Sequence, residues 1–111
     1  MAGISESDSA RAREIREALM KGFIDGAIDR GNSLINPDHP YVIIGQDPFD
    51  YNMFPMGSAA DLESVSELAR KKMEEDEIDN PSLFAMHTDI GIYDRRGRRL
   101  MPVQKPPTEI N

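Results

Sequence analysis

The chain has 111 residues, a formal net charge of −7 and no cysteine. The absence of cysteine excludes disulfide bonds, thiol nucleophiles and metal sites built from cysteine ligands. The acidic balance disfavours direct binding of nucleic acid, because neutralising a phosphate backbone requires a basic surface. Hydrophobic residues make up 39% of the chain and charged residues 30%, as in ordinary folded proteins, so we expect one domain over residues 1–111.

The N-terminal sequence predicts neither a targeting segment nor a membrane segment. It lacks an apolar stretch behind a basic start, and no apolar run approaches the roughly 18 to 20 residues needed to cross a bilayer. We therefore expect a cytoplasmic protein that makes no contact with a membrane.

The first predicted element is a helix over residues 5–31, where Gly31 is a suitable terminator. At about 100° per residue, the apolar side chains of this helix cover more of its circumference than one sheet face can bury. Met20, Ile24 and Ile28 extend the apolar surface well around the helix. We therefore expect these three residues to contact a partner, either a second copy of the chain or a different protein.

A sheet-and-helix core is predicted over residues 41–104. The β-branched run at 41–44 predicts a buried strand, and the alternation of apolar and polar residues at 49–54 predicts a second short strand beside it. An amphipathic helix is predicted from Ser58, as its N-cap, to Glu77.

The C-terminal part of this core predicts a hairpin. Residues 82–93 alternate as a strand, residues 94–97 suit a turn, residues 98–103 form the returning strand, and residues 105–111 are an extended tail. The predicted fold class is therefore α+β, with a small antiparallel sheet and the element order α-β-β-α-β-β. We expect the amphipathic helix to pack on one face of the sheet, and the fold to include an N-terminal helix as well.

An aromatic and methionine cluster spans residues 49–56, which include the second predicted strand. Such side chains fill irregular gaps in cores and also form adaptable binding surfaces. A domain of this size cannot easily bury all of them, so we expect part of the cluster to contact a partner. Its members are Phe49, Tyr51, Met53, Phe54 and Met56.

Two runs of charge are candidates for charged interaction with a partner or with each other. The basic run surrounds the predicted hairpin turn and comprises Arg95, Arg96, Arg98 and Arg99. The acidic run ends the second helix and comprises Glu74, Glu75, Asp76, Glu77 and Asp79. A solvated surface explains either run equally simply.

Signals for chemistry are few. His87 and Asp89 are two residues apart on a predicted strand, where they could act as an acid–base or metal pair if another ligand joined them. Phosphate-binding loops, nucleophile elbows and calcium loops leave recognisable patterns, and this sequence contains none of them. We therefore expect no catalytic residue, cofactor or metal.

The favoured functional hypothesis is a non-enzymatic protein–protein interaction module that forms a homo-oligomer or belongs to a larger assembly. The first alternative is an acidic inhibitor that mimics nucleic acid and occupies the site of a nucleic-acid-binding protein. The second alternative is a small hydrolase or metal site that uses His87 and Asp89.

Overall fold

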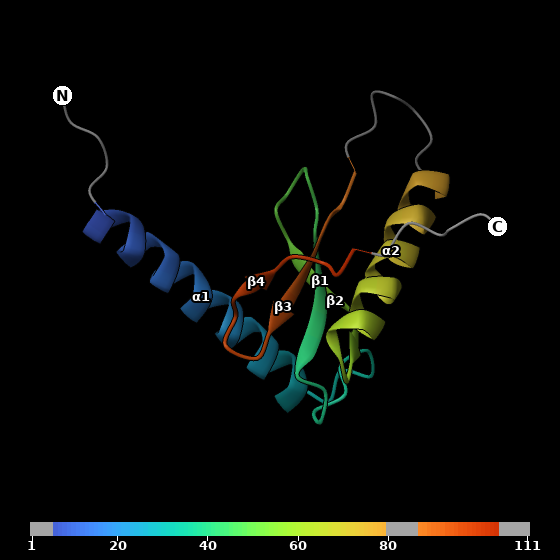
Figure 1. The fold of residues 1–111 in the computed structure, drawn as a ribbon, viewed down its shortest axis with the longest axis horizontal. Helices are drawn as coiled ribbons and strands as arrows, with labels where there is room; N and C mark the ends of the chain where they lie inside the picture. The colour runs from blue at the N-terminus through green and yellow to red at the C-terminus, as the bar shows by residue number, and fades with distance from the viewer. Residues whose placement is uncertain (1–5, 80–86, 105–111) are drawn as a thin grey trace.

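The computed structural model describes residues 6–79 and 87–104, and two helices and four strands lie within these ranges (Figure 1). The fold is α+β with the predicted element order. Neither helix is both long enough and apolar enough to cross a bilayer. The helices are α1 (Glu6–Asp29) and α2 (Leu62–Asp79), and the strands are β1 (Tyr41–Gln46), β2 (Met53–Ala59), β3 (Asp89–Asp94) and β4 (Arg99–Leu100).

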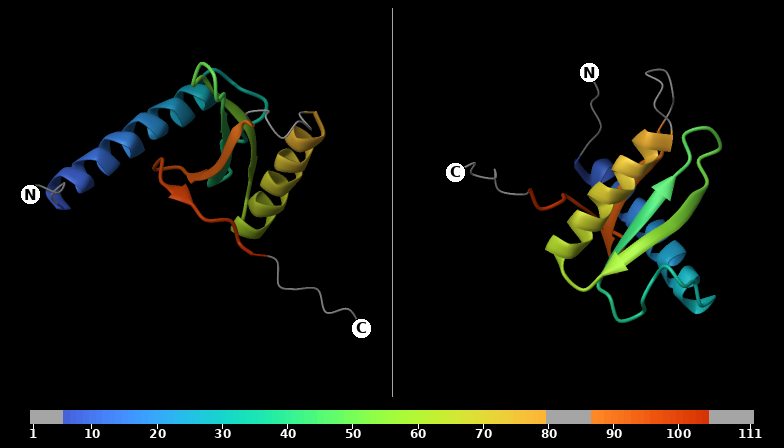
Figure 2. Two further views of the ribbon diagram at one scale, coloured as in Figure 1. Left: turned by 90° about the horizontal axis from the view of Figure 1, so that it is seen from above. Right: turned by 90° about the vertical axis from the view of Figure 1, so that its right-hand side faces the viewer.

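The four strands form one antiparallel sheet in the order β2-β1-β3-β4, which makes β1 a central strand. Val42 of β1, for example, lies opposite Ser58 of β2 on one side and Tyr93 of β3 on the other. Figure 2 shows α1 on one face of this sheet and α2 on the opposite face, so the fold has three layers. Because both faces of β1 are covered, its run of β-branched apolar residues is that of a buried strand.

The layer between α2 and the sheet holds one of two apolar cores. Val65 and Ala69 of α2 are buried against Ile43, Ile90 and Ile92 of the sheet. The two helical residues are four apart and the isoleucines alternate along their strands, as the two periodicities require. The predicted amphipathic helix and its packing on one face of the sheet are therefore confirmed.

The second core lies between the C-terminal half of α1 and the other face of the sheet. Ile24 and Ala27 are fully buried against Val42 and Ile44, and Ile35 from the loop after α1 closes this core. The N-terminal turns of α1 extend away from the sheet (Figure 1 and the left view of Figure 2). Only half of this long helix is therefore held by the rest of the fold.

The C-terminus of α1 ends where the sequence predicts. Gly31 has a φ of 72°, which places it in the left-handed region. Its N–H donates to the carbonyl of Ile28 at 2.9 Å, and the N–H of Asn32 donates to the carbonyl of Ala27 at 3.0 Å. These two bonds form a Schellman motif, which satisfies carbonyls that the helix end would leave unpaired.

The start of α2 differs from the prediction, because Ser58 is not its N-cap. The carboxylate of Asp61 caps the helix by accepting the N–H of Ser64 at 2.7 Å. Ser58 lies in β2, where its hydroxyl oxygen accepts the N–H of Asn36 at 2.9 Å and contacts Nδ1 of His39 at 2.8 Å. Ser58 therefore fastens the loop after α1 to the sheet.

The predicted second strand is present and pairs with β1, but its predicted bounds of 49–54 are wrong, because β2 begins only at Met53 and ends at Ala59. Residues 47–52 form a closed loop, in which the N–H of Asp47 donates to the carbonyl of Asn52 at 2.9 Å. β2 then continues through Pro55, which a strand at the edge of a sheet tolerates. A shift in pairing between Ile43 and Ile44 marks a bulge beside this proline.

The predicted hairpin is present, although its strands are short. β3 begins at Asp89, and the expected strand residues 82–86 lie outside the described residues. The turn forms as predicted: the N–H of Gly97 donates to the carbonyl of Asp94 at 3.0 Å, and Gly97 has a φ of 87°.

The returning strand is shorter than predicted, because β4 has only two residues. Beyond it the chain turns to α2, where the buried hydroxyl of Ser66 accepts the N–H of Val103 at 2.8 Å. A guanidinium nitrogen of Arg70 donates to the carbonyl of Val103 at 3.0 Å. Both backbone groups of Val103 are therefore held by α2 and not by a neighbouring strand.

Candidate functional site

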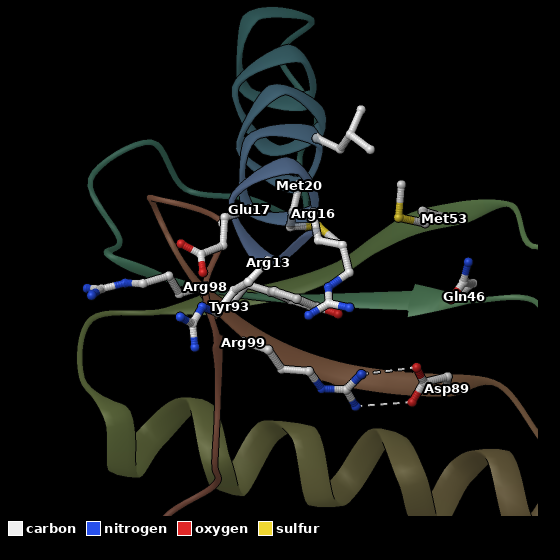
Figure 3. Close-up of a pocket in the computed structure, with 12 residues that line it drawn as sticks. Arg13, Arg16, Glu17, Met20, Gln46, Met53, Asp89, Tyr93, Arg98 and Arg99 are labelled. Atoms are coloured by element: carbon white, nitrogen blue, oxygen red, sulfur yellow. Dashed lines mark hydrogen bonds and ion pairs between the residues drawn. The ribbon is translucent and has the colours of Figure 1, made fainter. Parts of the chain in front are cut away.

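The candidate site is a groove of about 750 Å³ between the middle of α1 and the end of the sheet that carries Gln46, Met53 and Asp89 (Figure 3). Residues from α1, from the ends of β1 and β2, and from the β3–β4 hairpin line it. The polar and charged ones are Arg13, Arg16, Glu17, Gln46, Asp89, Arg98 and Arg99, and the remaining ones are Leu19, Met20, Met53, Tyr93 and Gly97. We call it the arginine groove.

The helix α1 supplies one wall of the arginine groove. Arg13, Arg16 and Met20 follow one another at spacings of three and four residues, which places them on one side of a helix. In Figure 3 their side chains point from α1 toward the sheet. Both arginines are exposed to solvent, so their charges are available to a ligand.

The hairpin sets the width of the groove through Gly97. A Cβ atom at this position would overlap the backbone of Glu17 and Lys21, so the hairpin tip lies directly against α1. There is a second reason for glycine at this position, because its positive φ is unfavourable for residues that carry a Cβ atom. The basic residues of α1 and those of the hairpin are thereby brought to the same groove.

The floor of the groove carries an ion pair. Two guanidinium nitrogens of Arg99 donate to the two carboxylate oxygens of Asp89, each at 3.1 Å. The side chain of Arg99 crosses Gly91, where a Cβ atom would lie only 2.9 Å from Cζ of the arginine. The guanidinium carbon also lies 5.8 Å from the ring centre of Tyr93, within the range of a cation–π contact.

The electrostatics of the groove oppose those of the whole chain. Four arginines and two carboxylates line it, although the chain has a formal net charge of −7. The hydrogen bond from Arg99 lowers the pKa of Asp89, and the same bond raises the pKa of Arg99. Both groups are therefore ionised at neutral pH, and the groove has a local positive balance.

The turn that carries Arg98 is held by the carboxylate of Asp94. One oxygen accepts the N–H of Arg96 at 2.9 Å and that of Arg98 at 3.0 Å, and the other accepts Nε of Arg98 at 2.8 Å. Burial raises the pKa of Asp94, but these hydrogen bonds outweigh it and the pKa is lowered.

The predicted apolar contact residues of the first helix have different positions. Met20 lines the arginine groove, whereas Ile28 packs half-buried on the core beneath α1. Ile24 is fully buried by its own chain, which removes it from any partner-binding surface. The large apolar residues of α1 that are exposed are instead Ile15 and Leu19.

The aromatic and methionine cluster is divided in a similar way. Met53 lines the groove, and Met56 packs against the core beneath α2. Phe49 and Tyr51 are 74% and 71% exposed on the loop between β1 and β2, and Phe54 is exposed to a smaller degree. Part of this cluster is therefore a surface, and its two most exposed rings lie on one loop.

Of the basic run, only Arg98 and Arg99 line the groove. Arg96 is exposed. Arg95 donates to the carbonyl of Pro37, in the loop after α1, at 2.8 Å, and its guanidinium lies 3.7 Å from the carboxylate of Asp25 in α1. The ion pairs of this run are made with aspartates of α1 and β3.

The acidic run forms the last turns of α2. Glu74, Glu75, Glu77 and Asp79 are exposed, and Asp76 contacts His87. At about 100° per residue these carboxylates point around the whole helix, whereas mimicry of nucleic acid requires a row that follows one side. The geometry therefore lends no support to the acidic inhibitor.

In the structure, His87 and Asp89 interact with different residues. Nδ1 of His87 contacts a carboxylate oxygen of Asp76 at 3.1 Å, whereas Asp89 is paired with Arg99. Within residues 6–79 and 87–104, no three side chains of the kinds that bind metals come together. The pair therefore gains no third ligand from the described part of the chain.

Sequence reasoning missed Arg13 and Arg16. The available signal was the spacing of the two arginines, which places them on one side of the helix, but the sequence does not show which side faces the hairpin. Comparisons of the chain with protein-family models, with curated proteins and with solved structures found no match. In chemical terms, the groove suits a ligand that offers apolar or aromatic groups together with negative charge.

Proposed function

We propose that this chain is a non-enzymatic protein-association module that acts in the cytoplasm, and that its partner is a second copy of itself. The observation that carries the proposal is the exposed apolar side of α1 beside the arginine groove. Ile15 and Leu19, one helical turn apart, are 55% and 67% exposed, and Leu19 also lines the groove. An apolar surface that continues into a groove is typical of protein interaction sites.

The free half of α1 supports the proposal. A helix of fewer than about 12 to 15 residues is marginally stable in water by itself, so helices in proteins are stabilised mainly by packing. The N-terminal turns of α1 extend away from the sheet (Figure 1). A partner lying along these turns would supply the packing that the chain's own sheet supplies only to the C-terminal half.

The charges on this half of α1 favour a second copy as the partner. Arg13 and Arg16 are interleaved with Glu14 and Glu17, so the helix carries both signs along its exposed length. A second copy of the helix carries the same mixture of signs, so acidic groups of each copy can pair with arginines of the other beside the apolar contact. Such self-complementarity is what a two-fold symmetric interface requires.

The chemistry of the groove favours binding over catalysis. Proton transfer near neutral pH requires a group whose pKa lies near the working pH. Among the described residues that line the groove there is no histidine, lysine or cysteine, the four arginines stay protonated, and Asp89 is held ionised by Arg99. These groups can orient and neutralise a ligand without reacting with it.

The test is sedimentation equilibrium across a concentration series. We expect the unmodified chain to form a dimer and Leu19→Glu to weaken the association at least tenfold, because a charge would then be buried in an apolar contact. Leu19 is exposed, so the substitution is expected to leave folding intact, which circular dichroism would verify.

Ile78→Glu is the matched control. Ile78 is an exposed aliphatic residue on α2 and does not line the groove, so this variant should associate like the unmodified chain. The proposal is overturned if the unmodified chain stays monomeric up to about 1 mM, where an association free energy of about −4 kcal/mol would already be detected. It is equally overturned if both substitutions weaken association to the same extent.

A further inference from the structure

The loop between β1 and β2 presents two aromatic side chains to solvent. Phe49 and Tyr51 are the two most exposed aromatic residues of the described chain. Each ring can bury a large area at little cost in conformational entropy, which is why aromatic side chains are frequent anchors of protein interfaces.

The loop is held in one conformation by its own polar groups. The carboxylate of Asp47 accepts the N–H of Phe49 at 2.7 Å and that of Asp50 at 3.2 Å. The carboxylate of Asp50 accepts the N–H and the side-chain amide of Asn52 at 3.0 and 2.9 Å. The rings are therefore displayed on an ordered loop, so little further ordering is needed when a partner binds.

Tyr51 occupies a backbone conformation that does not suit a tyrosine. Its φ is 60°, and it is the one described residue other than glycine with a positive φ. A residue with a Cβ atom is strained in this region, whereas glycine or asparagine is accommodated more easily. The fold alone would favour those residues, so the exposed ring points to a function of the tyrosine side chain.

The arginine groove offers chemistry that complements this loop. Guanidinium groups stack on aromatic rings, and methionine side chains make favourable contacts with them. The groove contains four arginines and two methionines. The negative charge of the Asp50 carboxylate in the loop would be attracted to the positive charge of the groove.

The loop and the groove also adjoin each other on the same molecule. Gln46 and Met53 flank the loop on either side, and both line the groove. The exposure of Phe49 and Tyr51 shows that the loop does not fold back into its own groove. Two copies related by a two-fold axis beside the loops would bring each loop to the groove of the other copy.

We infer that two copies of the chain form a symmetric dimer in which the loop of residues 47–52 of each copy enters the arginine groove of the other. Phe49 and Tyr51 lie there against the guanidinium and methionine side chains, and the carboxylate of Asp50 lies near the arginines. This inference rests on the proposed function and specifies its interface.

The test is complementation between two variants of the full chain. The loop variant carries Phe49→Ser and Tyr51→Asn, which remove the rings and favour the positive φ. The groove variant carries Arg16→Glu and Leu19→Glu, which reverse a charge and remove an apolar contact. Each variant alone is expected to sediment as a monomer where the unmodified chain is a dimer, because each of its homodimers lacks both contacts.

An equimolar mixture of the two variants distinguishes loop exchange from other contacts. It contains one intact groove on the loop variant and one intact loop on the groove variant, so we expect a mixed dimer with one contact. Its affinity should be weaker than that of the unmodified dimer by at least tenfold. Ile78→Asn, an exposed substitution outside the loop and the groove, should dimerise normally.

Each other outcome has a definite meaning. If the loop variant dimerises normally while the groove variant does not, the loop exchange is wrong and the proposed function stands. If both variants lose association and their mixture stays monomeric, the exchange is also wrong. If the unmodified chain is monomeric, the proposed function itself fails. Urea unfolding of both variants shows that they are folded, with the loop variant at least as stable as the unmodified chain.

Discussion

Gly97 of the β3–β4 hairpin lies against the backbone of Glu17 in α1, with no room for a side chain between them. This contact joins two segments that are far apart in the sequence, so that Arg16 of α1 and Arg98 of the hairpin line the same groove. The groove therefore depends on a glycine that carries no functional group.

Replacing Gly97 by alanine is expected to destabilise the fold. The new Cβ would meet the backbone of α1 and occupy a positive φ, so we expect the free energy of unfolding to fall by at least about 2 kcal/mol. Urea denaturation measures the change. Gly22→Ala is the matched control, because nothing lies within 4 Å of its added Cβ and alanine is the better helix former. Equal stability of the two variants would refute the tight contact.

Ser66 should contribute to stability through Val103. Its buried hydroxyl accepts the N–H of Val103 and donates to the carbonyl of Leu62 at 2.7 Å. Ser66→Ala leaves the N–H of Val103 without this acceptor, so we expect a loss of about 1 to 3 kcal/mol. Amide exchange at Val103 should also accelerate. The exposed Ser33→Ala should change stability by less than about 0.5 kcal/mol, and unchanged exchange in Ser66→Ala would contradict the contact.

Stability should fall on acidification, partly through Asp94. Its pKa is lower in the folded chain than in the unfolded chain, because the hydrogen bonds from Arg98 and Arg96 outweigh the effect of burial. Such a group contributes fully above its unfolded pKa of about 3.9, and the contribution is lost as the pH falls through the folded pKa. In Asp94→Asn, stability should be lower than in the unmodified chain above about pH 4, and the difference should shrink below it. Unfolding by urea between about pH 2.5 and pH 6 tests this, and parallel curves would contradict it.

The ion pair on the floor of the groove can be tested through Gly91. Alanine at this position would displace the guanidinium of Arg99, which lies across it, and the pKa of Asp89 should then rise toward its ordinary value. Carboxyl resonances followed by NMR during a pH titration measure this shift. The pKa of Asp61, which is lowered chiefly by the N–H of Ser64, should not change and serves as the internal control. An unchanged pKa of Asp89 would contradict the prediction, because Arg99 would then form the ion pair without lying across Gly91.

The sequence predicted the elements whose signal is local and strong. The β-branched run after Pro40 identified the central strand, and the alternation of Ile90 and Ile92 identified the core face of the hairpin. Gly31 and Gly97 marked the end of α1 and the turn, because positive φ is strongly selective for glycine. These features together were sufficient for the fold class.

Two local predictions failed because a second signal competed with the first. Residues 49–54 alternate like a strand, but the carboxylates of Asp47 and Asp50 hold residues 47–52 in a loop, and the strand begins only at Met53. Ser58 and Asp61 are both good N-caps, and pairing with β1 drew Ser58 into β2 despite Pro55 and Gly57. Edge position and a bulge made that strand possible.

The groove could not be predicted because it is assembled by packing. Arg13 and Arg16 lie near one end of the chain and Arg98 and Arg99 near the other, and only the docking of Gly97 on α1 brings them together. The apolar residues Ile15 and Leu19 resembled the buried face of α1, and only the position of the sheet decides that Ile24 is covered while they are not.

The central position of β1 has a consequence for how the chain assembles. β1 pairs with β2 across a short loop. Its pairing with β3 joins residues such as Gln46 and Asp89, and α2 lies between these two residues in the sequence, so β3 can pair only after α2 has been synthesised. Pairing across so long a separation is slow compared with closing a hairpin. Until β3 arrives, β1 keeps an open edge beside Ile43 and Ile44, and this interval is when the nascent chain is most exposed to aggregation.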